Sequence, residues 1–175
     1  MQHISMTPFG RQPVTAGLMA SLARAKAPSP LASVDKWHLL RDLTVARKAH
    51  CVTDRDLAVL SALLSFHPER CLTDDARLVV FPSNAALSER AHGMAESTLR
   101  RHLAALVRAG LILRRDSPNG KRFSRRGADG DRHAFGFDLR PLLVQSEAIA
   151  QQARIQREAD LRLRVLREEA VLLLR

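Results

Sequence analysis

Apolar residues recur at helical spacing along two stretches of the first half of the chain. The two patterns begin at Asp35 and at Thr53, and their apolar positions are Trp37, Leu40 and Leu43, then Leu57, Leu60 and Leu64. Thr53 and Asp56 have the spacing of a capping box, with Asp in place of the usual Glu. We therefore expect two helices, the second of them ended by Pro68.

The middle of the chain predicts two further helices separated by a tight turn. Ser83 is a good N-cap for a helix of about two turns, and His92-Gly93 then forms the turn. A longer helix is predicted from about Ala95 to Ala109, with Gly110 in a left-handed conformation just beyond its end. Its expected inward face consists of Leu99, Leu103, Leu106 and Val107, and its opposite face of Ser97, Arg100, Arg101, Ala104 and Arg108.

Short strand patterns lie on both sides of these helices. They are RLVVF at 77–81, LILRR at 111–115, with Leu111 and Leu113 on one side, and AFGFDL at 134–139. An excursion over 116–133, rich in Gly and charge, separates the last two. The order of elements is that of a winged helix-turn-helix. We expect a mainly α fold with a small β-wing, a MarR-like winged helix-turn-helix with flanking helices.

The composition divides the chain into three parts. Residues 1–33 are rich in Pro, Gly, Ala and Ser and are predicted to be a basic arm or linker, and 34–144 the winged-helix domain. Residues 145–175 lack Gly and Pro and form a helix with the apolar positions Ile149, Ala153, Leu163, Leu166, Ala170 and Leu173. This helix is expected to form a homodimer, or else to fold back on Trp37 and Leu40. The apolar ending AVLLLR suggests that a further C-terminal domain is absent.

The charge of the chain favours an anionic partner. The formal net charge is +10 and the pI is about 11.2, as expected for a protein that binds nucleic acid or an anionic membrane. No apolar run reaches the roughly 18 residues that span a bilayer, so a membrane partner is disfavoured. The N-terminus lacks the charged and apolar regions of a signal peptide, so we expect a cytoplasmic protein.

Several absences argue against an enzyme. The chain has no tyrosine, which excludes attack on a DNA phosphate by that residue. Gly120-Lys121 lacks the upstream glycine of a phosphate-binding loop, because position 115 is Arg. The spacing of Cys51 and Cys71, with His50 and His67 nearby, matches no common zinc pattern. We expect two reduced cysteines, at least one of them buried, with no metal, no cofactor and no catalytic site.

The basic residues instead indicate a double-stranded DNA partner. A charged helix face is often only solvated, but this helix follows a tight turn and is flanked by a second basic segment, 114–133, with a net charge of +4. Arginine can pair bidentately with guanine, and helix N-termini favour phosphate. The predicted DNA-binding residues are Ser83, Asn84, Ser97, Thr98, Arg100, Arg101, Arg108, Lys121, Arg122, Arg125 and Arg126.

The segment from "FPSNAALSERAHGMAESTLRRHL" through "RDSPNGKRFSRR" to "AFGFDLRPLL" resembles the N-terminal domain of RepC, the replication initiators of repABC-type plasmids in alphaproteobacteria. "TPFGRQPVT", residues 7–15, resembles the N-terminal motif of the same family, and Phe123 stands where the family has an aromatic residue, often tyrosine. The resemblance implies an initiator that binds a plasmid origin lying inside its own coding sequence, and a second domain. Two alternatives are a MarR-like repressor that binds a palindromic operator and a zinc-stabilised scaffold.

Overall fold

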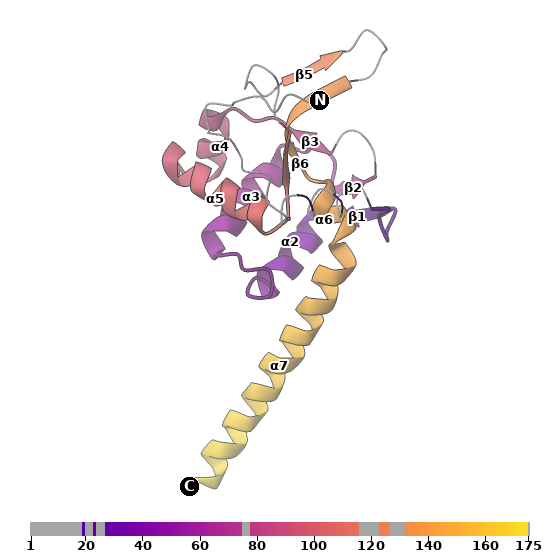
Figure 1. Ribbon diagram of the computed structural model, residues 1–175. Coiled ribbons are helices and arrows are strands. Elements are labelled where there is room, and N and C mark those ends of the chain that lie inside the picture. The colour runs from indigo at the N-terminus through magenta and orange to yellow at the C-terminus, as the bar shows by residue number, and fades with distance from the viewer. Residues whose placement is uncertain are drawn as a thin grey trace.

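The structure is a computed structural model that describes residues 19, 23, 27–74, 78–115, 123–126 and 132–174, with 123–126 and 132–135 described by their backbone alone. This part of the chain is mainly helical and contains small antiparallel sheets (Figure 1). The predicted fold class is confirmed to that extent. Among the described helices, none is both long enough and apolar enough to cross a membrane.

The first two helices begin at side-chain caps that the sequence specifies. Helix α2 spans Lys36–Val45, and the Asp35 carboxylate before it accepts hydrogen bonds from the backbone N–H groups of Trp37 and His38. Helix α3 spans Asp54–Ser65. There Thr53 Oγ1 accepts from the N–H of Asp56, and Asp56 Oδ2 accepts from the N–H of Thr53. The predicted capping box is therefore confirmed, and it satisfies two N–H groups that a helix start would otherwise leave unpaired.

Helices α4 (Asn84–Arg90) and α5 (Glu96–Arg108) also have the predicted ends. Ser83 Oγ caps α4 by accepting from the N–H of Ala86 at 3.1 Å. Between the helices His92 and Gly93 have φ values of 59° and 70°, so two successive residues in the left-handed region reverse the chain. Gly110 has φ 70° just after α5, as predicted for a glycine that ends a helix.

The core is one cluster that includes the place where α3, α4 and α5 pack together and extends to α2 and to the segments after α5. Helix α3 is buried over most of its circumference, because all four of its leucines are buried. This buried face is wider than the predicted stripe of three positions. These leucines meet Leu87 of α4 and the inward face of α5. The largest fully buried side chains of the whole core are Leu43, Leu60, Leu63, Leu64, Leu72, Leu78, Leu87, Leu99, Leu106, Leu111, Ile112 and Leu139.

A small sheet surrounds strand β6 (Arg132–Asp138). Its C-terminal half lies between β3 (Val79–Val80) and β4 (Leu113–Arg115), and all pairings are antiparallel. Its N-terminal half pairs with β5 (Phe123–Arg126), in a register that sets Arg125 opposite His133 and Arg126 opposite Arg132. The predicted strands are present in this sheet, and β5 and the start of β6 lie within the segment 116–133 that separates the last two of them in the sequence.

Strand β4 also differs from its prediction. It begins at Leu113, two residues later than expected, because Leu111 and Ile112 run through the core with both side chains fully buried. Alternation therefore does not describe this segment: the side chain at 112 does not point to solvent. Leu111, Ile112 and Leu113 are three consecutive apolar residues, as is typical of a segment that is buried on both faces.

A second sheet joins two distant short strands, β1 (Ser33–Asp35) and β2 (Cys71–Thr73), and it was not predicted. Cys71 on β2 is half-buried, and Cys51 is exposed in a left-handed turn after α2, with φ 54°. The expectation that at least one cysteine is buried is therefore wrong. Neither thiol is buried, because Cys71 lies on a short two-stranded sheet and Cys51 lies in a surface turn.

The C-terminal helical region has a break near its start. Helix α6 spans Arg140–Val144 and α7 spans Ser146–Leu173, with Gln145 between them donating from Nε2 to the carbonyl of Gly110 at 2.6 Å. Among the described residues, only the first turns of α7 pack on the rest of the chain, chiefly against α2. The rest of α7 extends away from the other described elements (Figure 1).

Candidate nucleic-acid interface

Helix α5 has the two faces that its sequence predicts. Its inward side chains Leu99, Leu103, Leu106 and Val107 are all buried, with Leu103 only 7% exposed. The predicted outward residues Ser97, Arg100, Arg101, Ala104 and Arg108 are all exposed. The rotation of the helix about its axis is therefore confirmed, and a row of hydrogen-bonding and cationic side chains faces away from the core.

The N-terminal end of α5 combines two hydroxyl side chains with an acidic residue, Glu96. Ala95 at the N-cap has no side-chain oxygen, so the first N–H groups of the helix receive no side-chain cap. Ser97 is exposed and Thr98 half-buried in this first turn. The partial positive charge at the N-terminus of a helix favours negative groups, and Glu96 in this first turn is one such group.

Glu96 joins two of the predicted DNA-binding residues. Its Oε1 accepts a hydrogen bond from Asn84 Nδ2 at the start of α4 and another from an Arg100 guanidinium nitrogen at 2.5 Å. The pair of Glu96 and Arg100 is about half exposed on both sides. Sequence reasoning did not select Glu96, although its position four residues before Arg100 is the spacing of a helical ion pair. The structure thus brings Asn84 and Arg100 together through a carboxylate.

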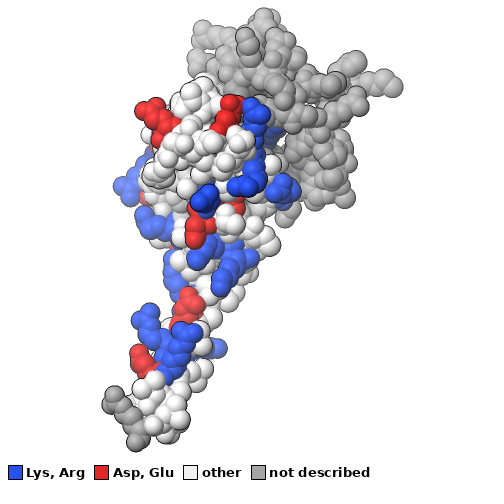
Figure 2. Space-filling view, turned by 90° about the vertical axis from the view of Figure 1, so that its left-hand side faces the viewer, with Lys and Arg blue, Asp and Glu red and all other residues white. Residues whose placement is uncertain are grey.

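Arg101 and Arg108 lie on the same outward face as Arg100, and both are exposed. Neither forms an ion pair or hydrogen bond with any residue in the part of the chain that the structure describes. Small Ala104 stands between them at helical spacing, so the face is not blocked by a bulky side chain. Figure 2 looks at the side of the molecule that carries α4 and α5, and Lys and Arg are distributed over it with Asp and Glu interspersed.

The predicted wing residues divide into two sets. Arg125 and Arg126 lie on β5, paired with β6. Lys121 and Arg122 lie outside the described residues. The structure therefore places the backbone of Arg125 and Arg126 in the antiparallel pairing of β5 with β6.

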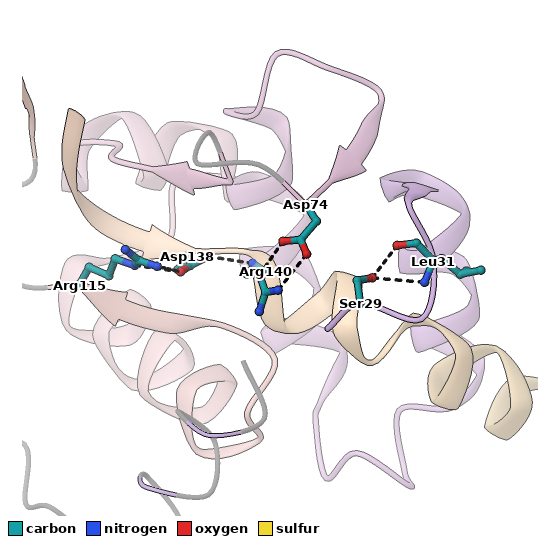
Figure 3. A network of polar contacts seen from close by, with 6 residues as sticks. All are labelled: Ser29, Leu31, Asp74, Arg115, Asp138 and Arg140. Atoms are coloured by element: carbon teal, nitrogen blue, oxygen red, sulfur yellow. Dashed lines mark hydrogen bonds and ion pairs between the residues drawn. The ribbon is translucent and has the colours of Figure 1, made fainter. Parts of the chain in front are cut away.

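Two ion pairs brace the base of this hairpin (Figure 3). Asp138 at the end of β6 is almost fully buried and accepts from Arg115 on β4, with the shorter contact at 2.6 Å. It also accepts from the backbone N–H of Arg140, whose guanidinium in turn holds Asp74 at 2.7 and 2.9 Å. The hydrogen bonds from Arg140 lower the pKa of Asp74. Arg115 contributes to the net charge of the segment 114–133, but its charge is compensated by Asp138.

The buried carboxylate of Asp56 on α3 contacts His102 on the inward side of α5. Burial alone raises the pKa of Asp56, but hydrogen bonds from the Thr53 hydroxyl, the Thr53 backbone and His102 outweigh it, and the pKa lies below its ordinary value. Asp56 is therefore held as a carboxylate between α3 and α5. In the described ranges no group of three or more His, Cys, Asp or Glu side chains could hold a metal ion.

Comparison with known proteins identifies the family. Residues 12–175 match the replication protein C N-terminal domain. The chain is 52% identical over 163 residues to a protein of Sinorhizobium fredii (strain NBRC 101917 / NGR234) named as a candidate replication protein C, covering 93% of this chain and 40% of that protein. It is 51% identical over 149 residues to a protein of Rhizobium rhizogenes with the same name, covering 85% and 37%. No solved structure matches.

The chain belongs to the replication protein C family and corresponds to its N-terminal domain. The resemblance read from the sequence is thereby confirmed. The chain spans about two fifths of the length of these curated relatives. Neither relative is named as a transcriptional repressor, so the MarR-like alternative gains no support from them.

Proposed function

We propose that this chain is the DNA-binding part of a plasmid replication initiator and that it binds double-stranded origin DNA as a winged helix-turn-helix. In this proposal α4 and α5 are the helix-turn-helix, β5 and β6 are the wing, and residues 34–144 are the DNA-binding domain. Residues 1–33 are an arm, and 145–175 are the segment for association with a second copy. The family to which the chain belongs supports the role in replication.

The outward face of α5 is the observation that carries the proposal. It presents arginines and a serine on a helix whose opposite face is fully committed to the core. A helix of this kind, following a short helix and a tight turn, fits the major groove of B-DNA. A formal charge of +10 adds the sequence-independent attraction that phosphates exert on a cationic protein.

Each predicted residue then has a chemical role. The first turn of α5, with Ser97 and Thr98, and the start of α4, with Ser83 and Asn84, bind backbone phosphates. Arg100 and Arg101 contact base edges or phosphates, and Arg108 extends the same face toward the C-terminal end of the helix. The wing cations Lys121, Arg122, Arg125 and Arg126 bind phosphates or enter the minor groove.

Footprinting tests the proposal directly. The probe is DNA of the chain's own coding sequence, where the resemblance implies the origin, and the control is shuffled DNA of the same composition. We expect protection of a discrete site, and an affinity whose logarithm falls with log salt at a slope of about −5 if about six phosphates are neutralised. Equal binding to both DNAs with a flat salt response would refute it.

A further inference from the structure

Helix α7 carries an apolar stripe that the rest of the described chain does not cover. Ile149 and Ala153 are fully buried, and Arg157 reaches Asp42 of α2 at 2.7 Å. From position 158 to 174 every residue of α7 is exposed. Within this segment the stripe residues Ala159, Leu163, Leu166, Ala170 and Leu173 alternate at steps of four and three. That alternation is the heptad spacing of a two-helix seam.

The stripe lies on a different side of α7 from the face that packs on α2. At about 100° per residue, it is rotated by about 100° from the line through Ile149 and Ala153. A helix laid along the stripe would therefore run beside the domain without displacing α2. Leu163 and Leu166 are 46% and 60% exposed, so the seam has apolar surface still to bury.

We propose that residues 156–173 of α7 pair with the same segment of a second copy of this chain, in antiparallel orientation. The pairing is centred between Arg164 and Val165. Leu163 then packs against Leu166 of the second copy, and Ala159 against Ala170 of the second copy. Two-fold symmetry repeats each contact, as in an isologous interface.

The charges beside the seam select the antiparallel orientation. Asp160 and Arg167 flank the stripe on one side, and Arg162 and Glu169 flank it on the other. Antiparallel pairing places Arg162 opposite Glu169 of the second copy and Asp160 opposite Arg167 of the second copy. Both pairs are attractive, and symmetry forms each of them twice.

Parallel pairing reverses this outcome. In a parallel two-helix seam the residue before one heptad contacts the residue five positions further along the other helix. Arg162 would then face Arg167 of the second copy, again twice, and the contact would be repulsive. The same sequence therefore favours one orientation of a second copy and disfavours the other.

Sedimentation equilibrium of the whole 175-residue chain, without DNA, tests the pairing independently of the proposed DNA binding. We expect a monomer–dimer equilibrium that shifts with concentration. Leu166→Asp, in the seam, should abolish the dimer. Val165→Asp makes the same kind of change one position away, outside the seam, and should leave the dimer intact. Thermal unfolding checks that both variants keep the folded domain.

Charge reversal then tests the orientation. Arg162→Glu makes the contact with Glu169 of the second copy repulsive, twice by symmetry, and should weaken dimerisation roughly tenfold at low salt. Combining it with Glu169→Arg restores complementary pairs and should restore the affinity. Arg164→Glu, which lies away from the seam, is the control for net charge and should have a much smaller effect.

Three results would overturn the proposal. A chain that stays monomeric at every concentration would mean that the stripe does not pair with a second copy. Tighter dimerisation of Arg162→Glu would mean that the helices pair in parallel. Equal loss of the dimer in Leu166→Asp and Val165→Asp would mean that the contact surface is not this stripe.

Discussion

His102 Nδ1 on α5 lies 2.7 Å from Asp56 Oδ1 on α3, and both side chains are buried. The other oxygen of Asp56 closes the capping box with Thr53. One carboxylate therefore fixes the start of α3 and the position of the middle of α5. The helix proposed to enter DNA is thus tied to the core by a polar contact as well as by its leucines.

Replacing Asp56 should destabilise the protein strongly. Asp56→Ala removes the cap and leaves the His102 imidazole buried without its partner, so we expect the free energy of unfolding to fall by about 2–4 kcal/mol. Urea denaturation measures this change. The control is Asp54→Ala two residues earlier, whose carboxylate is 80% exposed in a surface pair with Arg47. That variant should lose less than about 1 kcal/mol, and equal losses would contradict the role given to the buried pair.

Leu103 lies at the centre of the inward face of α5. Leu103→Ala should lower the free energy of unfolding by roughly 2–5 kcal/mol, because it removes a buried side chain and leaves a cavity. Differential scanning calorimetry gives the change in melting temperature. Arg101→Ala, on the outward face of the same helix, is the control and should melt close to the unchanged protein. An unchanged melting temperature for Leu103→Ala would be inconsistent with its burial.

Substitutions of the outward arginines of α5 and of the wing arginines should affect DNA binding differently. Arg100→Ala and Arg101→Ala are expected to reduce the preference for origin over shuffled DNA, by about 1–3 kcal/mol for whichever makes a bidentate base contact. Replacing Arg125 and Arg126 together should weaken binding to both DNAs about equally. Competition binding assays separate these effects. If the wing pair changed the preference and the α5 pair did not, the assignment of the two surfaces would be reversed.

Glu96 provides a separate test of how Arg100 is held. Glu96→Gln removes a negative charge beside the proposed phosphate site and loosens the hold on Arg100 and Asn84. We expect tighter binding to all DNA, because repulsion is lost, together with a smaller preference for the origin. Binding isotherms for origin and shuffled DNA measure both quantities. Weaker binding to both would indicate that Glu96 mainly orients Arg100 toward phosphate.

The protein should become less stable in acid, because protonation of Asp35 removes its ion pair with Arg70. The hydrogen bond from Arg70 is the largest cause that lowers the pKa of Asp35 to about 2 from 3.8. Because the folded-state pKa is the lower one, this stabilisation is complete above the unfolded-state pKa and is lost as the pH falls from about 4 toward about 2. Melting temperatures across that range should therefore drop.

Asp35→Asn isolates this contribution, since asparagine still serves as an N-cap for α2. The variant should show a shallower loss of stability between pH 4 and pH 2 than the unchanged protein. Arg70→Ala should change it in the same direction but less, because the N–H groups of Trp37 and His38 still lower the pKa of Asp35. The double variant should add nothing further, because both changes remove one interaction. An acid transition as steep as that of the unchanged protein in both variants would exclude the pair as its cause.

The parts of the site set by local pattern could be predicted from the sequence. The two faces of α5 follow from residue spacing within one helix, and the ends at Thr53, Ser83 and Gly110 follow from caps that act over a few residues. The outer part of α7 is exposed because a small domain covers only the first turns of a long helix.

The contacts that join distant residues could not be predicted in the same way. His102 and Asp56 are 46 positions apart, and their contact depends on how α3 packs on α5. Asn84 reaches Glu96 only because the turn at Gly93 brings two helix starts together. Strands β1 and β2 have three residues each, too few to show a periodic pattern, so their pairing depends on the surrounding fold.

Gly136 in β6 occupies a position that no larger residue fits. A Cβ atom built there would lie 2.2 Å from the carbonyl oxygen of Val80 on β3, closer than any real contact allows. Because β3 pairs with β6 at the adjacent positions, Gly136→Ala must push the two strands apart. We expect the free energy of unfolding to fall by about 1–3 kcal/mol or more, as measured by chemical denaturation.

The matched control is Gly93→Ala in the turn between α4 and α5. Gly93 has φ +70° but nothing within 4 Å of an added Cβ, so alanine there meets only the backbone cost of the left-handed region, about 1–2 kcal/mol. Gly93→Asn should recover part of that loss, since asparagine tolerates this conformation better. Gly136→Asn should recover nothing, because the obstacle at Gly136 is the Val80 carbonyl rather than the backbone angle. Recovery at both positions would show that the sheet can open to accept a side chain, and that the contact between β3 and β6 is looser than its geometry indicates.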